Sequence, residues 1–237
     1  MIIEVFGAKE KIFNFISLSN ELPQTFVPIY FGEDEGVIDK DKYVDRGRFK
    51  KFVNDNPLGF FLYSDYCQMD ITFSGIDSSI FIEIKKKQAI TDVRELLYKL
   101  AELDIDYAYS SMWEERLYRN GLVKKIGAST IENWVGRDYR KYLPGIYWGN
   151  LISIEMINRI GLDISELLKS SFYNFKVNEK FYYIQMYETP SSWQDFAPDL
   201  DTLSENLTGV FFKWDIWDEL EVIEDEKEYF ATCSNWP

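Results

Sequence analysis

Residues 59 to 110 constrain the fold more than any other part of the sequence. An apolar run from Gly59 to Ser64 is followed by a segment from Gln68 to Ser74 in which apolar and polar residues alternate, as in a half-buried strand. A Gly-Ile-Asp-Ser turn leads to a second run from Ile80 to Ile84, which predicts a hairpin. A helix and a strand from Ile105 to Tyr109 follow. We therefore expect an antiparallel sheet with a helix laid across it.

The helix of this unit is predicted from apolar residues that recur at helical spacing. Thr91 precedes the repeat and is the expected N-cap. The residues of the apolar face are Val93, Leu96, Leu97, Leu100 and Leu103. Because these positions lie on one side of a helix, that side is expected to pack on the sheet.

The second half of the sequence shows a similar order of strands and helices, without matching the first half residue by residue. Ser153 is an expected N-cap, Gly161 an expected helix end, and Asp163 begins a further short helix. The other expected elements are a strand from Tyr147 to Ile152, a helix from Ser153 to Ile160, a hairpin of Phe172–Val177 and Phe181–Tyr187, and a late strand from Val210 to Trp217.

The N-terminal part is less regular. Met1 to Phe6 is predicted as a strand, whereas Ile12 to Leu18 fits either a helix or a strand. No stretch rich in Gly, Ser or Pro separates two parts of the chain. We therefore predict one α+β domain over residues 1–237, with a curved, mostly antiparallel sheet and helices packed on one face.

The absence of histidine from all 237 residues excludes many kinds of active site. Histidine general bases, Ser-His-Asp and Cys-His triads, and zinc sites that need imidazole are all ruled out. The two cysteines, Cys67 and Cys233, are too few to complete a structural zinc site, and the sequence does not tell whether they lie near each other. We expect no metal and no cofactor, and we expect two inert, reduced thiols of a cytoplasmic protein.

The formal net charge is −14, and most of it lies near the C-terminus. Residues 188–237 contain 13 acidic residues against Lys213 and Lys227, whereas the other 187 residues contain 27 acidic and 24 basic ones. Nucleic acid as a ligand is disfavoured, because the phosphate backbone attracts basic surfaces. No apolar stretch approaches the length of a membrane span, so we expect no membrane partner. An acidic segment favours a basic protein partner or serves solubility.

Carboxylates are the main alternative source of chemistry in this sequence. Asp104 and Asp106 stand two residues apart at a strand entrance, where their side chains share a face. Such a pair occurs in hydrolases and magnesium sites. Similar pairs are Asp199 with Asp201 and Glu114 with Glu115. In a chain with 40 acidic residues, however, solvated acids at element ends are the more ordinary interpretation.

A second cluster, rich in tyrosine and basic residues, precedes residue 144. Arg137, Arg140 and Lys141 stand beside Tyr139 and Tyr142, a combination that can stack on nucleotide bases. One such cluster on an acidic protein is a weak indication of nucleic-acid binding. A structural loop that holds the two halves of the domain together is the favoured interpretation.

One motif follows that cluster and carries a resemblance to a known family. Its residues are Pro144-Gly145-Ile146-Tyr147-Trp148-Gly149-Asn150, then the helix ending at Gly161, then Gln185-Met186-Tyr187-Glu188-Thr189-Pro190. This order resembles bacterial immunity proteins of polymorphic and type VI toxin systems. The resemblance covers about the middle third of the chain. It implies a non-catalytic cytoplasmic protein that binds and neutralises one cognate toxin, with Pro144, Gly145, Tyr147, Trp148 and Asn150 as the structural motif.

The acidic C-terminal segment is the expected surface for that toxin, which we expect to have a basic surface. The candidate partner-binding residues are Asp215, Asp218, Glu219, Glu221, Glu224, Asp225, Glu226 and Glu228. Two other functions remain open at this stage. One is a carboxylate-dependent enzyme or small-ligand protein, and the other is a phage-encoded inhibitor of a bacterial defence nuclease.

Overall fold

A computed structural model describes residues 1–18, 21–35, 41–42, 46–74, 77–86, 90–120, 122–126, 129–132 and 139–211. The strands are β1 (Ile2–Gly7), β2 (Tyr30–Gly32), β3 (Asp41–Lys42), β4 (Gly59–Tyr63), β5 (Cys67–Ser74), β6 (Asp77–Ile84), β7 (Tyr107–Ser111), β8 (Leu122–Ile126), β9 (Ser129–Glu132), β10 (Gly149–Ser153), β11 (Tyr173–Asn178) and β12 (Phe181–Gln185). The helices are α1 (Lys9–Leu18), α2 (Arg46–Asp55), α3 (Ile90–Leu100), α4 (Trp113–Asn120), α5 (Ile154–Ile160), α6 (Ile164–Ser170) and α7 (Trp193–Asn206).

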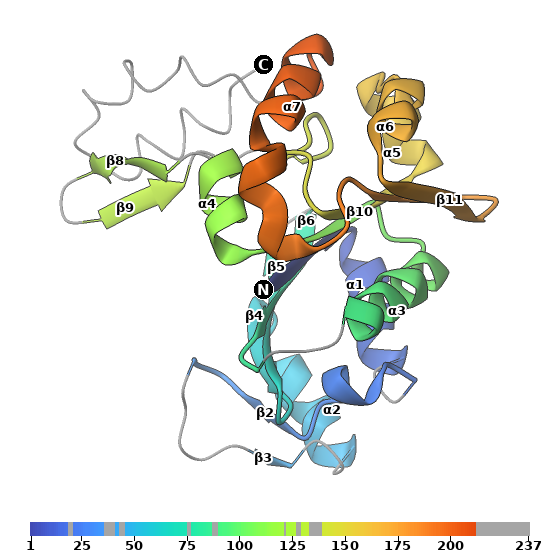
Figure 1. Ribbon diagram of the computed structural model, residues 1–237. Helices are drawn as coiled ribbons and strands as arrows, with labels where there is room; N and C mark the ends of the chain where they lie inside the picture. Colours follow the sequence, from blue (N-terminus) through green and yellow to red (C-terminus); the bar gives the residue numbers. More distant parts are fainter. Residues whose placement is uncertain are drawn as a thin grey trace.

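Ten of these strands form one curved sheet in the order β11-β12-β10-β7-β1-β6-β5-β4-β2-β3, and β8 and β9 form a separate hairpin (Figure 1). Every neighbouring pair in the large sheet is antiparallel. The predicted α+β class with a mostly antiparallel, curved sheet is therefore confirmed. The predicted β5–β6 hairpin pairs Met69 with Ile82 and Ile71 with Ile80, so its apolar residues lie opposite one another.

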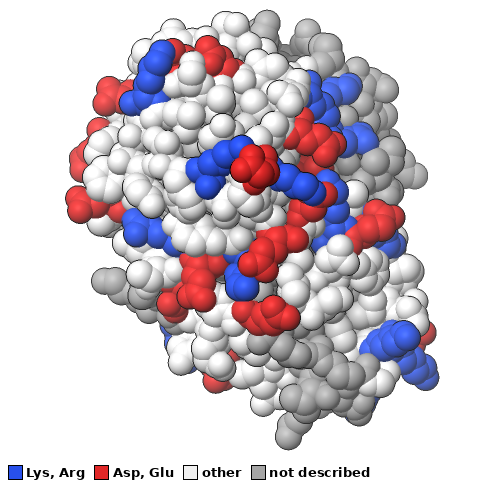
Figure 2. All heavy atoms as spheres, turned by 90° about the vertical axis from the view of Figure 1, so that its right-hand side faces the viewer, with Lys and Arg blue, Asp and Glu red and all other residues white. Residues whose placement is uncertain are grey.

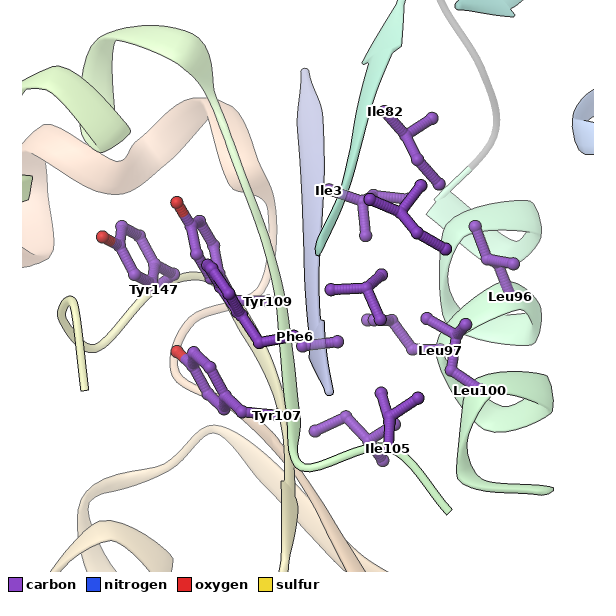
Figure 3. Close-up of a cluster of buried hydrophobic side chains, with 14 of the residues drawn as sticks. Ile3, Phe6, Ile82, Leu96, Leu97, Leu100, Ile105, Tyr107, Tyr109 and Tyr147 are labelled. Atoms are coloured by element: carbon purple, nitrogen blue, oxygen red, sulfur yellow. The ribbon is translucent and has the colours of Figure 1, made fainter. Parts of the chain in front are cut away.

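The central strand β1 is buried along its whole length because both faces of the sheet are covered there. Figure 3 shows the two sides: Ile3 points toward Leu96 of α3, whereas Phe6 lies with Tyr109 on the opposite side. Four of the apolar positions predicted for this helix are fully buried in α3, namely Val93, Leu96, Leu97 and Leu100. The fifth, Leu103, is also buried but lies in the short 3-10 helix η2 (Ala101–Leu103) that follows α3. Thr91 is already inside α3, which begins at Ile90.

Helices lie on both faces of the sheet. In Figure 1, α1 and α3 lie on one side of the central strands and α4 and α7 on the other. An ion pair of 2.8 Å joins Arg116 of α4 to Glu4 of β1, and Arg119 of α4 contacts Asp201 of α7 at 3.3 Å. The predicted helical layer on one face is thus present, and α4 and α7 add a second layer that the prediction did not include.

The caps predicted in the second half are confirmed. The Ser153 hydroxyl accepts a hydrogen bond of 3.0 Å from the Met156 amide at the start of α5. Gly161 ends this helix at φ +67°, a left-handed conformation that favours glycine. Asp163 caps α6 by accepting from the Ser165 amide at 3.0 Å. These ends depend on local hydrogen bonds, which explains why the sequence predicts them.

Three helices need the tertiary structure to be understood. The segment Ile12–Leu18, left open between helix and strand, lies within α1, where Ile12, Phe15 and Ile16 are buried. The basic helix α2 was not predicted, because it contains few apolar residues that could show a helical repeat. One of them, Phe49, packs against Phe31 of β2 at a ring-centroid distance of 5.0 Å. The acidic helix α7 was also missed, since Pro198 lies inside it and proline usually marks a helix end.

Two further predictions concern the C-terminal part. Of the strand predicted from Val210 to Trp217, only Val210 and Phe211 are described, and Phe211 forms an isolated parallel bridge with Leu143. None of the described helices is both long and apolar enough to cross a membrane. The candidate partner-binding residues Asp215, Asp218, Glu219, Glu221, Glu224, Asp225, Glu226 and Glu228 lie outside the described residues.

Candidate functional site

The motif at residues 144–150 lies in the interior, next to the centre of the sheet. Tyr147 and Trp148 are fully buried. Gly145 lies against the ring of Tyr147, and an added Cβ at this position would lie 3.1 Å from the ring carbon Cζ. The turn before the strand therefore fits closely over Tyr147, and a side chain there would push the ring aside.

Asn150 explains how this segment is held. Its side-chain amide donates to the carbonyl oxygens of Tyr147 at 2.8 Å and Ile184 at 3.3 Å. Its Oδ1 atom accepts from the Tyr147 amide and from the Tyr107 hydroxyl, each at 3.2 Å. One buried side chain thus fixes the turn, β7 and β12 together. We call this arrangement of Asn150, the turn and the two strands the clamp.

The motif also covers a buried charged cluster on the α4 side of the sheet. The rings of Tyr109 and Tyr147 stack at a centroid distance of 3.7 Å and an angle of 10°. The Tyr109 hydroxyl donates to the carboxylate of Glu4, whose other oxygen accepts from Arg116 at 2.8 Å. Burial raises the pKa of both tyrosines well above the ordinary value, so both phenols stay protonated.

A second ion pair lies beside the first, along α4. Glu115 is fully buried and accepts from Arg119 at 3.0 Å and from the Tyr187 hydroxyl at 2.5 Å. Arg119 also reaches Asp201 of α7 at 3.3 Å. Burial raises the pKa of Glu115, while the nearby Arg119 and the hydrogen bond from Tyr187 lower it. These contacts attach both α4 and α7 to the sheet.

Asp104 and Asp106 do not form a shared site. Asp104 has a left-handed backbone with φ 57° and is half exposed beside Lys180 at 3.1 Å. Asp106 is buried and its carboxylate lies 3.1 Å from Lys11 and 3.7 Å from Arg159. Asp104 is the C-cap of η2 (Ala101–Leu103), and its carboxylate has a different partner from that of Asp106, so the carboxylate pair considered from the sequence is not formed.

The other acidic pairs are also separated. Glu114 is exposed, whereas its neighbour Glu115 is buried. Asp199 is exposed, whereas Asp201 accepts from Tyr118 at 2.6 Å. In the part of the chain that the structure describes, no three His, Cys, Asp or Glu side chains come together in a way that could hold a metal ion.

The basic, tyrosine-rich cluster before the motif is divided in the same way. Tyr139 is buried and donates from its hydroxyl to Asp106 at 3.3 Å, so it stabilises the fold. Arg140 and Tyr142 are half buried and Lys141 is exposed, while Arg137 lies outside the described residues. The tyrosine most central to the cluster is thus not accessible for stacking on a base.

Cys67 is the first residue of β5 and is buried as a free thiol. Burial raises its pKa to about 11, so the thiol remains protonated and is a poor nucleophile. The main cause of this increase is the loss of solvent around the buried thiol. Cys233 lies outside the described residues.

An exposed surface of aromatic and acidic side chains lies on the outer side of α4 and α7, and we call it the α4–α7 surface. Tyr118 is 47% exposed and Phe196 38% exposed. The Tyr118 ring contacts Trp193 at 5.4 Å, and the Phe196 ring stacks on Tyr187 at 5.2 Å. The α4–α7 surface consists of Tyr118, Asp195, Phe196, Asp199, Asp201 and Glu205.

The four acids of this surface belong to the C-terminal excess of negative charge, and all four lie on α7. Helix α7 has four acidic residues and no Lys or Arg along its 14 residues. The buried residues Ala197, Leu200 and Leu203 occur at helical spacing, and this pattern was the available indication of a helix with an acidic outer side.

Comparisons with known proteins give no match to this chain, whether with protein families, with curated proteins or with solved structures.

Proposed function

We propose that this chain is a non-catalytic immunity protein that binds and neutralises a cognate toxin. The resemblance of the segment from Pro144 to Pro190 suggests the class of protein. The observation that carries the proposal is the α4–α7 surface, where exposed aromatic rings stand among acidic side chains. Aromatic residues are common anchors of protein interfaces, and acidic groups around them attract a basic partner.

The buried contacts below this surface support a binding role. Arg119 connects the carboxylate of Glu115 inside the molecule to Asp201 at the surface. Phe196 rests on the ring of Tyr187, which in turn donates to Glu115. The surface is therefore attached to the sheet by buried hydrogen bonds, and a rigid surface loses less conformational entropy when a partner binds.

The alternative of a carboxylate-dependent enzyme receives less support. The buried carboxylates of Glu4, Asp106 and Glu115 each contact an arginine or lysine of the same chain. Such groups stabilise the fold and are not directed at a shared substrate position. A phage-encoded inhibitor of a defence nuclease would use the same binding physics as an immunity protein, and only the identity of the partner distinguishes the two.

Co-expression with the toxin encoded beside its gene tests the proposal. We expect the chain to restore growth of cells that produce this toxin, and the two purified proteins to form a complex. A toxin from an unrelated system is the control, because immunity surfaces are matched to one partner. Continued cell death together with the absence of a complex would contradict the proposal.

Restored growth of the toxin-producing cells that is accompanied by cleavage of the toxin would instead favour an enzyme. A complex formed with a nuclease of a bacterial defence system, but not with the neighbouring toxin, would favour the phage inhibitor.

A further inference from the structure

The strand β11 is the last strand at one end of the ten-stranded sheet and pairs only with β12. The direction of its backbone groups follows from the hydrogen bonds on the other side of β12. The Met186 amide donates to the Trp148 carbonyl at 2.9 Å, and the Ile154 amide donates to the Lys180 carbonyl at 2.8 Å. The even-numbered residues of β12, and Lys180 and Met186 at its two ends, therefore direct their backbone groups toward β10.

The odd-numbered residues of β12 direct their backbone groups toward β11, because these directions alternate along an antiparallel strand. Tyr183 lies opposite Phe175, so the N–H and C=O of Phe175 point inward to β12. The N–H and C=O of Asn174 and Lys176 consequently point outward. Among the described residues, no strand and no loop forms a backbone hydrogen bond with this outer edge.

The side chains of this edge are unusually apolar for an outermost strand. Phe172 is 58% exposed and Tyr173 is 48% exposed. Phe175 is half buried, with its ring 5.1 Å from Tyr98 of α3. An edge strand with exposed apolar residues is a template for pairing with another strand, and proteins usually protect such edges with charges.

The charges near this edge are compensated. Lys176, the one charged residue within β11, forms an ion pair of 2.6 Å with Glu179. Figure 2 shows the side of the molecule on which α5, α6 and β11 lie in Figure 1, and its Lys and Arg residues stand mostly next to Asp or Glu. A face with mixed charges gives little repulsion between two identical copies.

We propose that two copies of this chain pair through β11 as antiparallel strands, with Phe175 of each copy opposite the other on the two-fold axis. In this register Asn174 of each copy faces Lys176 of the second copy. The outward N–H and C=O groups of these residues then form about four hydrogen bonds, two for each pair. Other registers bring fewer of the outward groups opposite one another within β11.

The same register places apolar side chains together. Phe175 meets its own copy in a pair without hydrogen bonds, where opposing side chains approach most closely. Tyr173 and Val177 point to the same face as Phe175, so Tyr173 of one copy lies opposite Val177 of the other. The aromatic group that Phe175 forms with Tyr98 would thus continue across the axis.

The pairing is limited in length. The register between β11 and β12 shifts between Lys176 and Asn178, and such a bulge twists the strand and ends regular pairing. The interface is therefore small, and we expect a dimer that dissociates in the micromolar range. A second copy fits this edge because the register is self-complementary, and the inference does not depend on the proposed function.

Sedimentation of the full chain over about 1 to 200 µM tests the proposal, since a weak dimer dissociates on dilution. We expect Asn174→Pro to remove the dimer or raise its dissociation constant at least tenfold, because proline has no N–H to offer at the edge. Asn174→Ala is the matched control. It loses the same side-chain bonds to Leu168 and Ser171 but keeps the N–H, so it should still dimerise.

A wild-type chain that is monomeric at every concentration would overturn the proposal. So would a dimer that a folded Asn174→Pro variant leaves unchanged. Circular dichroism shows whether that variant folds, and Lys176→Pro with Lys176→Ala repeats the comparison at the second outward position.

A cysteine at the axis tests the register without any proline. Phe175→Cys, made together with Cys233→Ser, should form an intermolecular disulfide on mild oxidation. Val177→Cys in the same background should not, because residue 177 faces residue 173 of the other copy. Equal crosslinking of both variants, or of neither in a dimeric sample, would overturn the register.

Discussion

The hydroxyl of Tyr187 donates a hydrogen bond of 2.5 Å to the carboxylate of Glu115, although 72 positions separate the two residues. The same carboxylate receives the Nε–H of Arg119 at 3.0 Å. Through this one group, the segment that follows β12 is held to α4, and Arg119 extends the connection to Asp201 of α7. A buried carboxylate thus organises the side of the molecule that carries the α4–α7 surface.

The first prediction concerns pH and Glu115. Burial raises the pKa of this carboxyl above its ordinary value of 4.5, so the folded state holds the proton more tightly than the unfolded state. The stability that this difference contributes is full below pH 4.5 and is lost as the pH rises through the raised pKa. We expect the stability of the wild type, relative to Glu115→Gln, to fall over that interval.

Urea unfolding at a series of pH values measures this difference. Glu114→Gln is the matched control, because it removes one negative charge from the exposed neighbouring position. A stability difference between wild type and Glu115→Gln that rises with pH over the same interval would contradict the prediction. Such a result would mean that the pairing with Arg119 dominates over burial.

The second prediction concerns Trp148. This side chain is fully buried, and its indole Nε1 has no hydrogen-bond partner among the described residues. Trp148→Ala should lower the free energy of unfolding by about 3–5 kcal/mol, because it leaves a cavity in the core. Trp148→Phe should cost less, since a ring still fills most of the space and no buried N–H is left unpaired.

Chemical denaturation of both variants checks this order. If Trp148→Ala keeps the stability of the wild type but loses binding to the toxin, Trp148 belongs to the interface, and its role as part of the clamp is refuted.

The third prediction compares two aspartates that the sequence grouped together. Asp106→Asn should destabilise the protein by about 1.5–3 kcal/mol, because the charged groups of Lys11 and Arg159 lose their carboxylate partner. Asp104→Asn should change stability by less than about 0.5 kcal/mol, since its ion pair with Lys180 is exposed. Thermal melts of the two variants measure the difference.

These variants also test the enzymatic alternative. We expect the purified protein to have no hydrolase, nuclease or transferase activity. Turnover that disappears in a folded Asp104→Asn or Asp106→Asn variant would favour the carboxylate-dependent enzyme.

The fourth prediction concerns charge and the rate of toxin binding. Neutralising Asp195, Asp199 and Glu205 of the α4–α7 surface, as Asn, Asn and Gln, should slow association while dissociation changes little. The effect should be large at low salt and small at 150 mM, because the Debye length falls from about 30 Å at 10 mM to about 8 Å. Stopped-flow mixing with the cognate toxin measures both rates.

The acidic segment predicted from the sequence is tested in the same assay by changing Glu224, Asp225 and Glu226 to Gln, Asn and Gln. The matched control neutralises three exposed acids elsewhere on the molecule: Glu10 of α1, Glu21 shortly after α1, and Glu95 of α3. If the control variant slows association as much as the other two, only the net charge matters, and neither acidic segment is a specific binding surface.

Local patterns were sufficient to predict many elements. Alternation from Gln68 to Ser74 indicated β5, and the spacing of Leu96 and Leu100 indicated α3 and its buried face. Ser153 and Gly161 marked the ends of α5 because capping depends on hydrogen bonds within a few residues. The absence of histidine excluded histidine-based chemistry, and the positions of the acidic residues placed the excess of negative charge near the C-terminus.

Other features depend on contacts between distant residues, and no local pattern contains them. Ile12 to Leu18 became a helix because its apolar residues pack on the sheet, and α2 is held by Phe49 against Phe31. The positions of Asp104 and Asp106 show the same limit, because their spacing predicted a shared face whereas the turn at Asp104 directs them to different partners.

The buried charges give the physical reason most directly. Glu4, Glu115 and Arg119 appear as ordinary charged residues in the sequence, and burying any one of them alone would be strongly unfavourable. The fold brings each within hydrogen-bond distance of an opposite charge or a tyrosine. The residue types were therefore determined along the chain, while the burial of these groups, the raised pKa of Glu115 and the surface that the groups support were decided only when the sheet brought them together.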